Sequence, residues 1–347
     1  MKMNDCYLPA EWCEQSMIQL TWPHEGTDWA YMLPEVEECF CRLAHEISSR
    51  QHLLIVTPDP KAVQEKLEKQ DVSLDNISWA CVKTNDTWAR DHSFITLLDA
   101  QGTPHLLDFC FNGWGMKFPA NLDNQINRAL RDTDLLHGEY HNRKSFVLEG
   151  GSIESDGQGT LLTTAECLFS PNRNDSMNPQ EIETSLKDTL GASRVLWLHH
   201  GYLAGDDTDS HVDTLARLCP DDTIVYVQCL DKNDEHYEEL KLMEKELSDF
   251  RTLSGLPYRL LPLPMPDAVY DDEGERLPAT YANFLIMNDV VLYPTYQQPV
   301  HDAEAGKVLG EAFPGREIVG VDCSPLIKQH GSLHCVTMQY PKEVRNI

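Results

Sequence analysis

The sequence lacks a long uncharged apolar segment, a Cys-x-x-Cys pair and an apolar region near its first residue. A bilayer-spanning helix needs about 20 apolar residues and a signal peptide needs an apolar core, so we expect a cytoplasmic protein that does not enter a membrane. The eleven cysteines are spread along the chain without an export signal. We therefore expect reduced thiols rather than a disulfide framework, and no structural zinc site.

Basic residues are also scarce, with 28 lysines and arginines against 56 acidic residues and a net charge of −28. This balance argues against nucleic acid and anionic membrane partners and would favour encounter with a small cation. On charge alone, the favoured interpretation is that the acidity keeps the protein soluble. The expected strands are not followed by Gly-x-Gly-x-x-Gly or a phosphate loop, so nucleotide binding is not expected.

Apolar spacing indicates helices that are each followed by a strand, and this order predicts an α/β fold. The chain has no linker rich in glycine, proline or serine, so residues 1–347 are expected to form a single domain. Periodicity does not decide between an open sheet and blades arranged about an axis. The expected helix–strand pairs are 35–49 with 52–57, 60–69 with 77–83, 121–136 with 145–148, 177–190 with 194–198, 233–253 with 258–263, and 301–312 with 316–321, and further short extended segments are 93–98, 159–164, 224–228, 281–287 and 290–294.

Residues 7–33 are predicted to be irregular and contain Trp12, Trp22 and Trp29 together with acidic residues such as Glu11. Aromatic rings and carboxylates suit a lip that receives an organic cation. Packing of this segment on the core is the favoured alternative.

Polar residues interrupt the expected apolar pattern in two places near the middle of the chain. Asp91 and Trp88 follow the strand 77–83, where a carboxylate beside an indole could hold a cation, although Arg90 and Asp91 could simply close a turn as an ion pair. Glu149 precedes Gly150 and a second glycine, which allow a sharp bend close to a ligand. The alternative for Glu149 is a solvated side chain.

His211 and Asp213 form a third polar group. If this segment were a strand, residues two apart would share a face and could act on one ligand, or the histidine could be structural. His199 and His200 lie upstream, so a metal site is an alternative, but the spacing of these three histidines is not that of a zinc site.

Cys335 follows a turn that contains Gly331 and precedes an alternating, β-prone segment. Most free cysteines are core residues, but a nucleophilic one needs a base and an orienting carboxylate from elsewhere in the fold. His334 is adjacent to Cys335 and is a poor candidate for the base, because on a strand it would point to the other face.

One cysteine, one histidine and three carboxylates suit a planar cation better than an acyl substrate. A guanidinium offers five donors that aspartates can accept in pairs, and its charge keeps the central carbon electrophilic. A cationic substrate and an imidazolium would also lower the pKa of a nearby thiol.

These residues resemble the agmatine deiminases of the guanidino-group-modifying (pentein) superfamily, in the branch that includes peptidylarginine deiminases. The resemblance extends nearly end to end, and its motifs are specific in combination. The matching segments are Leu8–Trp12, Thr21–Pro23, Trp88–Asp91, Glu149–Ile153, His211–Asp213, Tyr281–Phe284 and His334–Cys335.

The resemblance implies a five-bladed α/β propeller with pseudo-fivefold symmetry and a central active site. It implies that Cys335 is the nucleophile, His211 the general acid and base, Asp91 and Asp213 the guanidinium-binding carboxylates, and Glu149 an acid beside the histidine and the substrate. Trp88 matches a tryptophan of the family's site motif. No metal or organic cofactor is implied.

The implied reaction converts agmatine and water to N-carbamoylputrescine and ammonia through a covalent cysteine intermediate, a hydrolysis of a linear amidine on the way to putrescine. Residues 329–335 depart from the family's usual Gly-Gly-Gly-Asn-Ile-His-Cys, residues 207–210 from its Glu-Thr-Asn-Gly, and Gln15 replaces a common histidine. Deimination of free or peptide arginine by the same residues therefore stays as an alternative. Two further alternatives are a metallohydrolase that uses His199, His200 and His211 and a guanidino-compound binding protein without turnover. The oligomeric state is left open.

Overall fold

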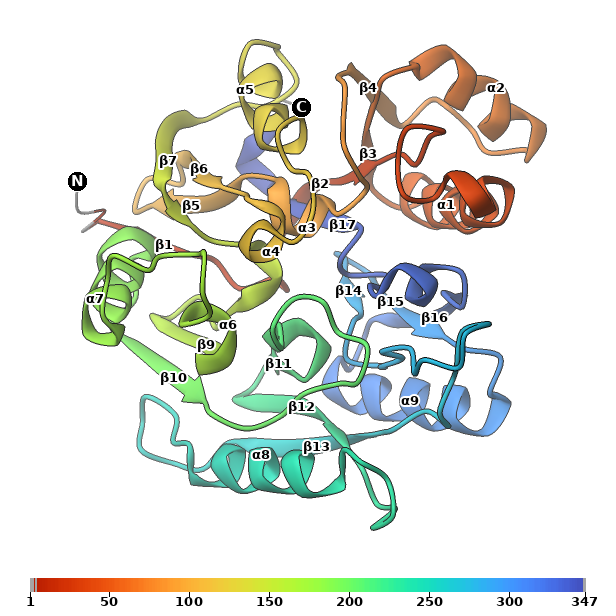
Figure 1. Ribbon diagram of the computed structural model, residues 1–347. Helices are drawn as coiled ribbons and strands as arrows, with labels where there is room; N and C mark the ends of the chain where they lie inside the picture. The colour runs from red at the N-terminus through yellow and green to blue at the C-terminus, as the bar shows by residue number, and fades with distance from the viewer. Residues whose placement is uncertain (1–2, 4, 346–347) are drawn as a thin grey trace. The chain divides into compact units, whose positions relative to one another are not determined.

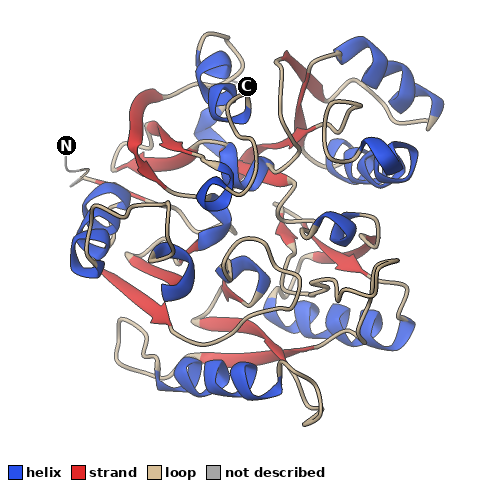
Figure 2. Cartoon of the chain, viewed as in Figure 1, coloured by secondary structure: helices blue, strands red, loops and turns tan. Residues whose placement is uncertain are grey.

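Residue 3 and residues 5–345 are described by the computed structural model, which has five β-sheets flanked by helices (Figures 1 and 2). The chain divides into two compact units. Unit 1 comprises Met1–Trp12 and Gly151–Leu333, and unit 2 comprises Cys13–Gly150 and His334–Ile347. Among the described helices, none is long and apolar enough to cross a membrane.

Unit 2 contains two sheets and the helices that cover them. In the first, β2, β3 and β4 are parallel and the C-terminal β17 pairs antiparallel with β2. In the second, β5 and β6 are antiparallel and β6 and β7 are parallel. The elements are β2 (Gln15–Thr21), α1 (Leu33–Ser48), β3 (His52–Thr57), α2 (Pro60–Lys69), β4 (Ile77–Cys81), α3 (Ala89–His92), β5 (Ile95–Asp99), β6 (Pro104–Cys110), α4 (Gly113–Met116), α5 (Ile126–Arg131), β7 (Glu139–Val147) and β17 (Thr337–Pro341), with short 3₁₀ turns η1 (Ala30–Met32), η2 (Asp123–Gln125) and η6 (Lys342–Val344).

Unit 1 contains three sheets of the same construction. In each, an antiparallel pair is followed by a helix and by a strand that returns parallel to the second member of the pair. Figure 1 shows α8 lying along β12 and β13. The elements are β1 (Cys6–Tyr7), β8 (Ile153–Ser155), β9 (Thr160–Thr164), α6 (Ala165–Leu168), α7 (Pro179–Leu190), β10 (Arg194–Leu198), β11 (Ala216–Cys219), β12 (Thr223–Gln228), α8 (Tyr237–Asp249), β13 (Arg259–Pro264), β14 (Leu285–Ile286), β15 (Val290–Thr295), α9 (Pro299–Ala312) and β16 (Glu317–Asp322), with 3₁₀ turns η4 (Val212–Thr214) and η5 (Leu326–Gln329), while η3 (Gly150–Ser152) begins at the last residue of the first segment of unit 2.

Local sequence explains why these elements begin and end where they do. β3 pairs with a parallel strand on each side and is buried at every position, and its four residues between His52 and Thr57 are all apolar. α7 begins with a capping box between Asn178 and Glu181 and ends at Gly191, which has a φ of +67°. A Cβ on Gly191 would lie 1.8 Å from the carbonyl oxygen of Cys6, so only glycine fits there.

The apolar core of unit 2 connects both of its sheets and extends to the loop that follows β4. It includes residues of β2, β3, β4, β6, α5 and β17, together with Ala89 at the start of α3. Because Ala89 is packed in this core, the backbone that carries Asp91 is fixed by apolar burial of its neighbour.

The predicted α/β class is confirmed, and several elements match their predicted bounds. Strand 52–57 and helix 60–69 agree with β3 and α2 at both ends. The predictions were wrong in the segment 7–33, which contains β2, and for the helix 121–136, of which only 126–131 is α-helical. Strand 145–148 begins earlier, at residue 139, and strand 281–287 is limited to residues 285–286. β6 and β11 were not predicted.

Candidate active site

Four of the six predicted site residues, Trp88, Asp91, Glu149 and Cys335, belong to unit 2. Asp91 lies in the one-turn helix α3 and is 4% exposed. Its carboxylate oxygen Oδ2 accepts a hydrogen bond from Nε1 of Trp114 at 2.9 Å. This indole N–H therefore orients the carboxylate.

Trp88 lies at the centre of a row of three indoles in unit 2. Its ring centroid is 5.7 Å from that of Trp29 and 6.3 Å from that of Trp114. Trp29 is fully buried and donates from Nε1 to Asp86 at 2.9 Å. The favoured alternative for residues 7–33, packing on the core, is thus confirmed for Trp29 and also for Trp22, which is 1% exposed.

The buried Asp123 supports the loop that carries the half-buried Asp86 and Trp88. Asp123 accepts hydrogen bonds from the backbone N–H groups of Asn85, at 2.6 Å, and Asp86, at 3.1 Å. Burial raises the pKa of Asp123 to about 7 and that of Asp86 to about 6. Both groups favour the protonated state more than exposed carboxylates do.

Glu149 is fully buried, so the alternative of a solvated glutamate is wrong. The close approach predicted for the glycines after it is present in unit 2, because a Cβ on Gly150 would lie 2.3 Å from the carbonyl oxygen of Arg90. The absence of a side chain at Gly150 lets the end of β7 pass directly against the residue before Asp91.

Cys335 lies in a turn just before β17 and is 5% exposed. Its carbonyl oxygen accepts a hydrogen bond from the backbone N–H of Arg90 at 3.1 Å. The guanidinium of Arg90 donates to Oε1 of Gln339 at 2.6 Å. Unit 2 therefore joins the segment of the predicted nucleophile to the segment of Asp91, although they are far apart in the sequence.

His211 and Asp213 belong to unit 1 and are 1% and 0% exposed. The prediction that they lie on a strand was wrong: Asp213 is within the 3₁₀ turn η4 and His211 is the residue before it. The same-face argument for a strand does not apply here. Two hydrogen bonds hold the turn instead. The hydroxyl of Thr214 donates to the carbonyl oxygen of His211 at 2.8 Å, and the hydroxyl of Thr280 donates to the carbonyl oxygen of Thr214 at 2.8 Å.

The loop before His211 is strained and braced. Asp209 and Ser210 have φ values of +63° and +64°. The asparagine and glycine that the family usually has at these positions adopt this left-handed conformation at a lower energetic cost. Asp206 accepts a hydrogen bond from the N–H of Ser210 at 2.7 Å. Arg173 forms an ion pair with Asp209 at 2.6 Å and donates to the carbonyl oxygen of Thr208 at 2.8 Å.

The altered loop 329–334 contacts this same region within unit 1. Nδ1 of His330 is 2.7 Å from the carbonyl oxygen of Gly205, and the hydroxyl of Ser332 is 2.9 Å from that of Tyr296. The two departures from the family pattern therefore lie next to each other, which their separation in the sequence does not reveal.

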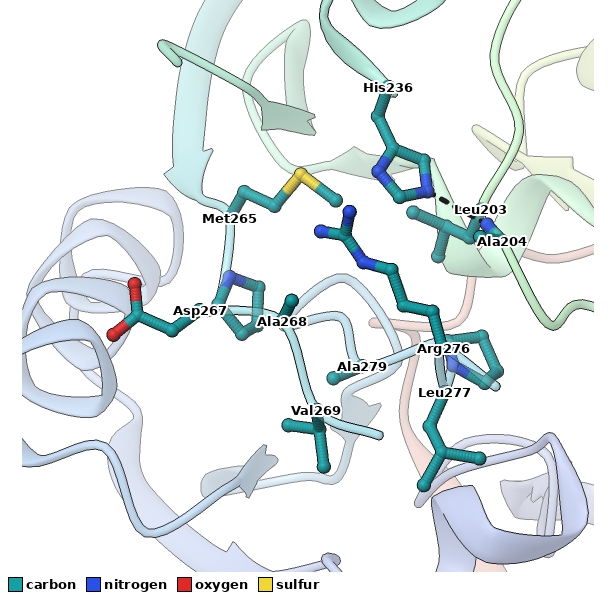
Figure 3. A pocket seen from close by; sticks show the side chains of 12 residues that line it. Leu203, Ala204, His236, Met265, Asp267, Ala268, Val269, Arg276, Leu277 and Ala279 are labelled. Atoms are coloured by element: carbon teal, nitrogen blue, oxygen red, sulfur yellow. Dashed lines mark hydrogen bonds between the residues drawn. The ribbon is translucent and has the colours of Figure 1, made fainter. Parts of the chain in front are cut away.

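Arg276 is another basic residue that sequence reasoning did not single out. It lines a small pocket of unit 1 with His236 and Met265 (Figure 3). Its guanidinium donates to Asp234 at 2.8 Å and to Glu235 at 3.2 Å. Both partners are carboxylates, so Arg276 is electrostatically compensated and is a poor receptor for a further carboxylate.

His199 and His200 lie after β10 in unit 1. Their backbone N–H groups donate to Glu246 at 2.9 Å and 3.2 Å, and Nδ1 of His200 is 3.1 Å from Glu239. These contacts tie both residues to α8.

Comparison with known proteins places the whole chain. Residues 7–341 match the family model described as Porphyromonas-type peptidyl-arginine deiminase. The chain belongs to this peptidylarginine deiminase/agmatine deiminase family. Its members are guanidino-group deiminases, hydrolases that act on amidines.

Individual members of the family agree over nearly the full length. An agmatine deiminase from Ectopseudomonas mendocina is 29% identical over 357 residues, which are 96% of this chain and 95% of the relative. A solved Porphyromonas gingivalis protein provisionally named an arginine deiminase is 53% identical, with a TM-score of 0.93 and coverage of 98% and 100%. A C. jejuni agmatine deiminase with substrate bound is 37% identical, with a TM-score of 0.89 and coverage of 96% of both chains. The predicted family is confirmed.

Sequence reasoning missed Trp114 and Asp123 of unit 2 and Arg173 of unit 1, which contact the segments of the predicted site residues. Trp114 lies between two glycines, and the sequence Gly113–Gly115 could have been noticed as an unusual turn. All three residues from 113 to 115 have positive φ values, and Trp114 has a φ of +54°. A non-glycine residue in that conformation is a signal of a constrained, functional loop.

Proposed function

We propose that this deiminase hydrolyses agmatine to N-carbamoylputrescine and ammonia. The observation that carries the proposal is the arrangement in unit 2, where the backbone of Arg90 donates to Cys335 and the next residue, Asp91, is oriented by an indole N–H. A carboxylate and a thiol on joined segments suit a reaction at a guanidinium carbon. The likeness to a C. jejuni agmatine deiminase supports the choice of substrate.

In the proposed mechanism Asp91 and Asp213 hold the guanidinium and keep it charged. The thiolate of Cys335 attacks its central carbon, and protonated His211 gives a proton to the nitrogen that leaves as ammonia. His211 then takes a proton from water, whose oxygen attacks the amidino-thioether carbon. The C–S bond breaks, and the carbamoyl product and the thiolate are released. Glu149 is proposed to lie beside the histidine and the substrate.

Trp88 is proposed to bound the substrate as part of the indole row. An aromatic face next to a cation contributes about 0.5–2 kcal/mol, depending on how well water is excluded. Trp88 is 5% exposed, which favours the upper part of that range.

We also propose that the fold is a five-bladed propeller formed by one catalytic domain, residues 1–347. The support is a fivefold repeat of the same motif, an antiparallel pair followed by a helix and a parallel strand. In one repeat the antiparallel partner is the C-terminal β17, beside the N-terminal β2. Such pairing is how a radial repeat closes its ends. The proposed reaction uses no metal or organic cofactor.

Arginine, free or in a peptide, is the second candidate substrate, because a P. gingivalis relative at 53% identity is provisionally named an arginine deiminase. Arginine adds an α-carboxylate or its amide, which the protein must accommodate. Arg276 already pairs with two carboxylates and is therefore not proposed as the group that binds an α-carboxylate.

The test is ammonia release with agmatine, free arginine and an N-acetyl-arginine peptide, each with and without EDTA. We expect preference for agmatine and no effect of EDTA. Preference for either arginine form would replace the proposed substrate, and loss of activity in EDTA at a temperature where the protein stays folded would favour a metallohydrolase.

Three variants test the roles, and His200→Gln is the matched control for His211→Gln. Cys335→Ser should abolish turnover while agmatine still binds. If the protein only binds guanidino compounds, the parent itself would show no turnover. His211→Gln should abolish turnover and His200→Gln should leave it intact. Normal turnover in Cys335→Ser would disprove the covalent mechanism, and loss in His200→Gln would revive the histidine metal site.

A further inference from the structure

Four polar side chains of three neighbouring strands lie on one face of the second sheet of unit 2. His105 of β6 is directly opposite Glu139 of β7, and His141 is two residues further along β7 on the same face. In the antiparallel pair of β5 and β6, His105 is opposite Leu97, so Asp99 is on this face too. Strand register alone therefore gathers two imidazoles and two carboxylates.

The ligand atoms of three of these residues converge. Nδ1 of His105 is 2.9 Å from Nε2 of His141. Oε2 of Glu139 is 3.6 Å from Nδ1 of His105 and 4.0 Å from Nε2 of His141. Zinc bonds of 2.0–2.1 Å at tetrahedral angles hold ligand atoms roughly 3.3 Å apart. The observed separations scatter around that value.

Asp99 supplies an orienting partner. Its Oδ1 accepts backbone hydrogen bonds from Gln101 at 2.9 Å and Thr103 at 2.7 Å, and its Oδ2 is 3.6 Å from Nε2 of His105. A carboxylate behind the second nitrogen of a histidine favours the tautomer whose Nδ1 lone pair faces the other ligands. In metal-bound histidines such a carboxylate accepts a hydrogen bond from the second ring nitrogen, so the 3.6 Å separation would have to shorten when the ion binds.

We propose that His105, His141 and Glu139 bind a divalent transition-metal ion of the zinc type, with Asp99 as the orienting carboxylate of His105. Two nitrogens and one oxygen leave a fourth position for water. The side chains of His105 and His141 are 11% and 20% exposed, and that of Glu139 is 66% exposed, so an ion can enter from solvent beside the glutamate.

The position on the strand indicates a stabilising ion rather than a participant in deimination. His141 is near the start of β7, whereas Glu149 follows its end at Val147. Because the register shifts after Arg143, His141 and Val147 are opposite Leu107 and Cys110 of β6, which are three residues apart, or roughly 10 Å at about 3.3 Å each. The ion would bridge β6 and β7 at the edge of the sheet away from Glu149.

The test measures Zn²⁺ binding to the full chain by equilibrium dialysis, in a Cys335→Ser background that removes the proposed nucleophile as a ligand. We expect one Zn²⁺ that is lost in His105→Gln and in His141→Gln, with affinity reduced at least 100-fold. Glu139→Gln and Asp99→Asn should each reduce it 10- to 100-fold. His45→Gln, an exposed histidine on α1, is the matched control and should bind as the parent does.

Two further readouts separate this ion from adventitious binding. Co²⁺ should give the visible absorption of a four-coordinate site without a thiolate charge-transfer band, and EDTA should lower the Tm of the parent but not of His141→Gln. If the histidine variants fold poorly, the exposed Glu139 still allows the test. Equal Zn²⁺ binding by parent and His105→Gln, or only millimolar affinity in the parent, would show a neutral hydrogen-bonded histidine pair instead.

Discussion

Trp114→Phe should weaken substrate binding by removing one hydrogen bond while keeping an aromatic ring. The indole N–H donates to Asp91 at 2.9 Å, and both side chains are buried. A hydrogen bond to a charged group contributes about 1.5–3 kcal/mol, and about 1.4 kcal/mol corresponds to a factor of ten. We therefore expect kcat/KM to fall roughly 10- to 150-fold.

The assay is steady-state ammonia release with agmatine, combined with calorimetric binding of agmatine in the Cys335→Ser background. If Asp91 loses its orientation, we expect a lower kcat/KM in the kinetic assay and a higher Kd for agmatine in the calorimetric one. Trp22→Phe is the matched control, because Nε1 of the equally buried Trp22 lies 3.4 Å from a carboxylate oxygen of Glu37. We expect the control to lose stability and to retain kcat/KM.

A folded Trp114→Phe protein with kcat/KM within twofold of the parent would refute this reasoning. It would mean that the orientation of Asp91 does not depend on the indole, or that Asp91 does not hold the substrate. An equal loss in Trp22→Phe would attribute the effect to general destabilisation.

Three further outcomes are expected from the scaffold of the candidate site. Burial raises the pKa of Asp123 to about 7, so the folded state binds this proton more tightly than the unfolded state does. The free energy of unfolding should therefore fall as pH rises from about 4 through 7, by about 1.4 kcal/mol per pKa unit. Asp123→Asn should flatten this dependence in urea titrations at pH 5 and 8, and an unchanged pH dependence would contradict it. Ser210→Gly should raise the free energy of unfolding by about 0.5–1 kcal/mol because Ser210 has a φ of +64°; a loss of stability would show that its side chain matters more than its backbone. Gly150→Ala should destabilise by about 1–3 kcal/mol and reduce turnover, because its Cβ would lie 2.3 Å from the oxygen of Arg90; near-normal Tm and rate would show that the bend can relax.

The elements that sequence reasoning predicted well are those with local signals. Helix α2 has Pro60 at its first position, Asp59 as its N-cap and an apolar face with helical spacing. β3 is a short apolar run that ends before Pro58. Both signals act within one or two turns of chain, so they are readable without the fold.

The missed elements lack such signals or depend on distant partners. β2 was hidden in a segment with tryptophans and prolines, and it is a strand because β3 and β17 provide hydrogen bonds on both sides. Asp213 lies in the 3₁₀ turn η4 and His211 directly precedes it, so neither is part of a strand. The positive φ values of Asp209 and Ser210 end any extended pairing before them.

The sequence by itself determined the family, the α/β class and the identity of the candidate site residues, because motifs and apolar periodicity are carried by neighbouring positions. Only the tertiary structure decided which distant groups meet. Trp114 reaches Asp91 across 23 residues, and His105 reaches His141 across 36. Such pairs follow from strand register and core packing, whose energies sum over many contacts along the whole chain and leave no local pattern in the sequence.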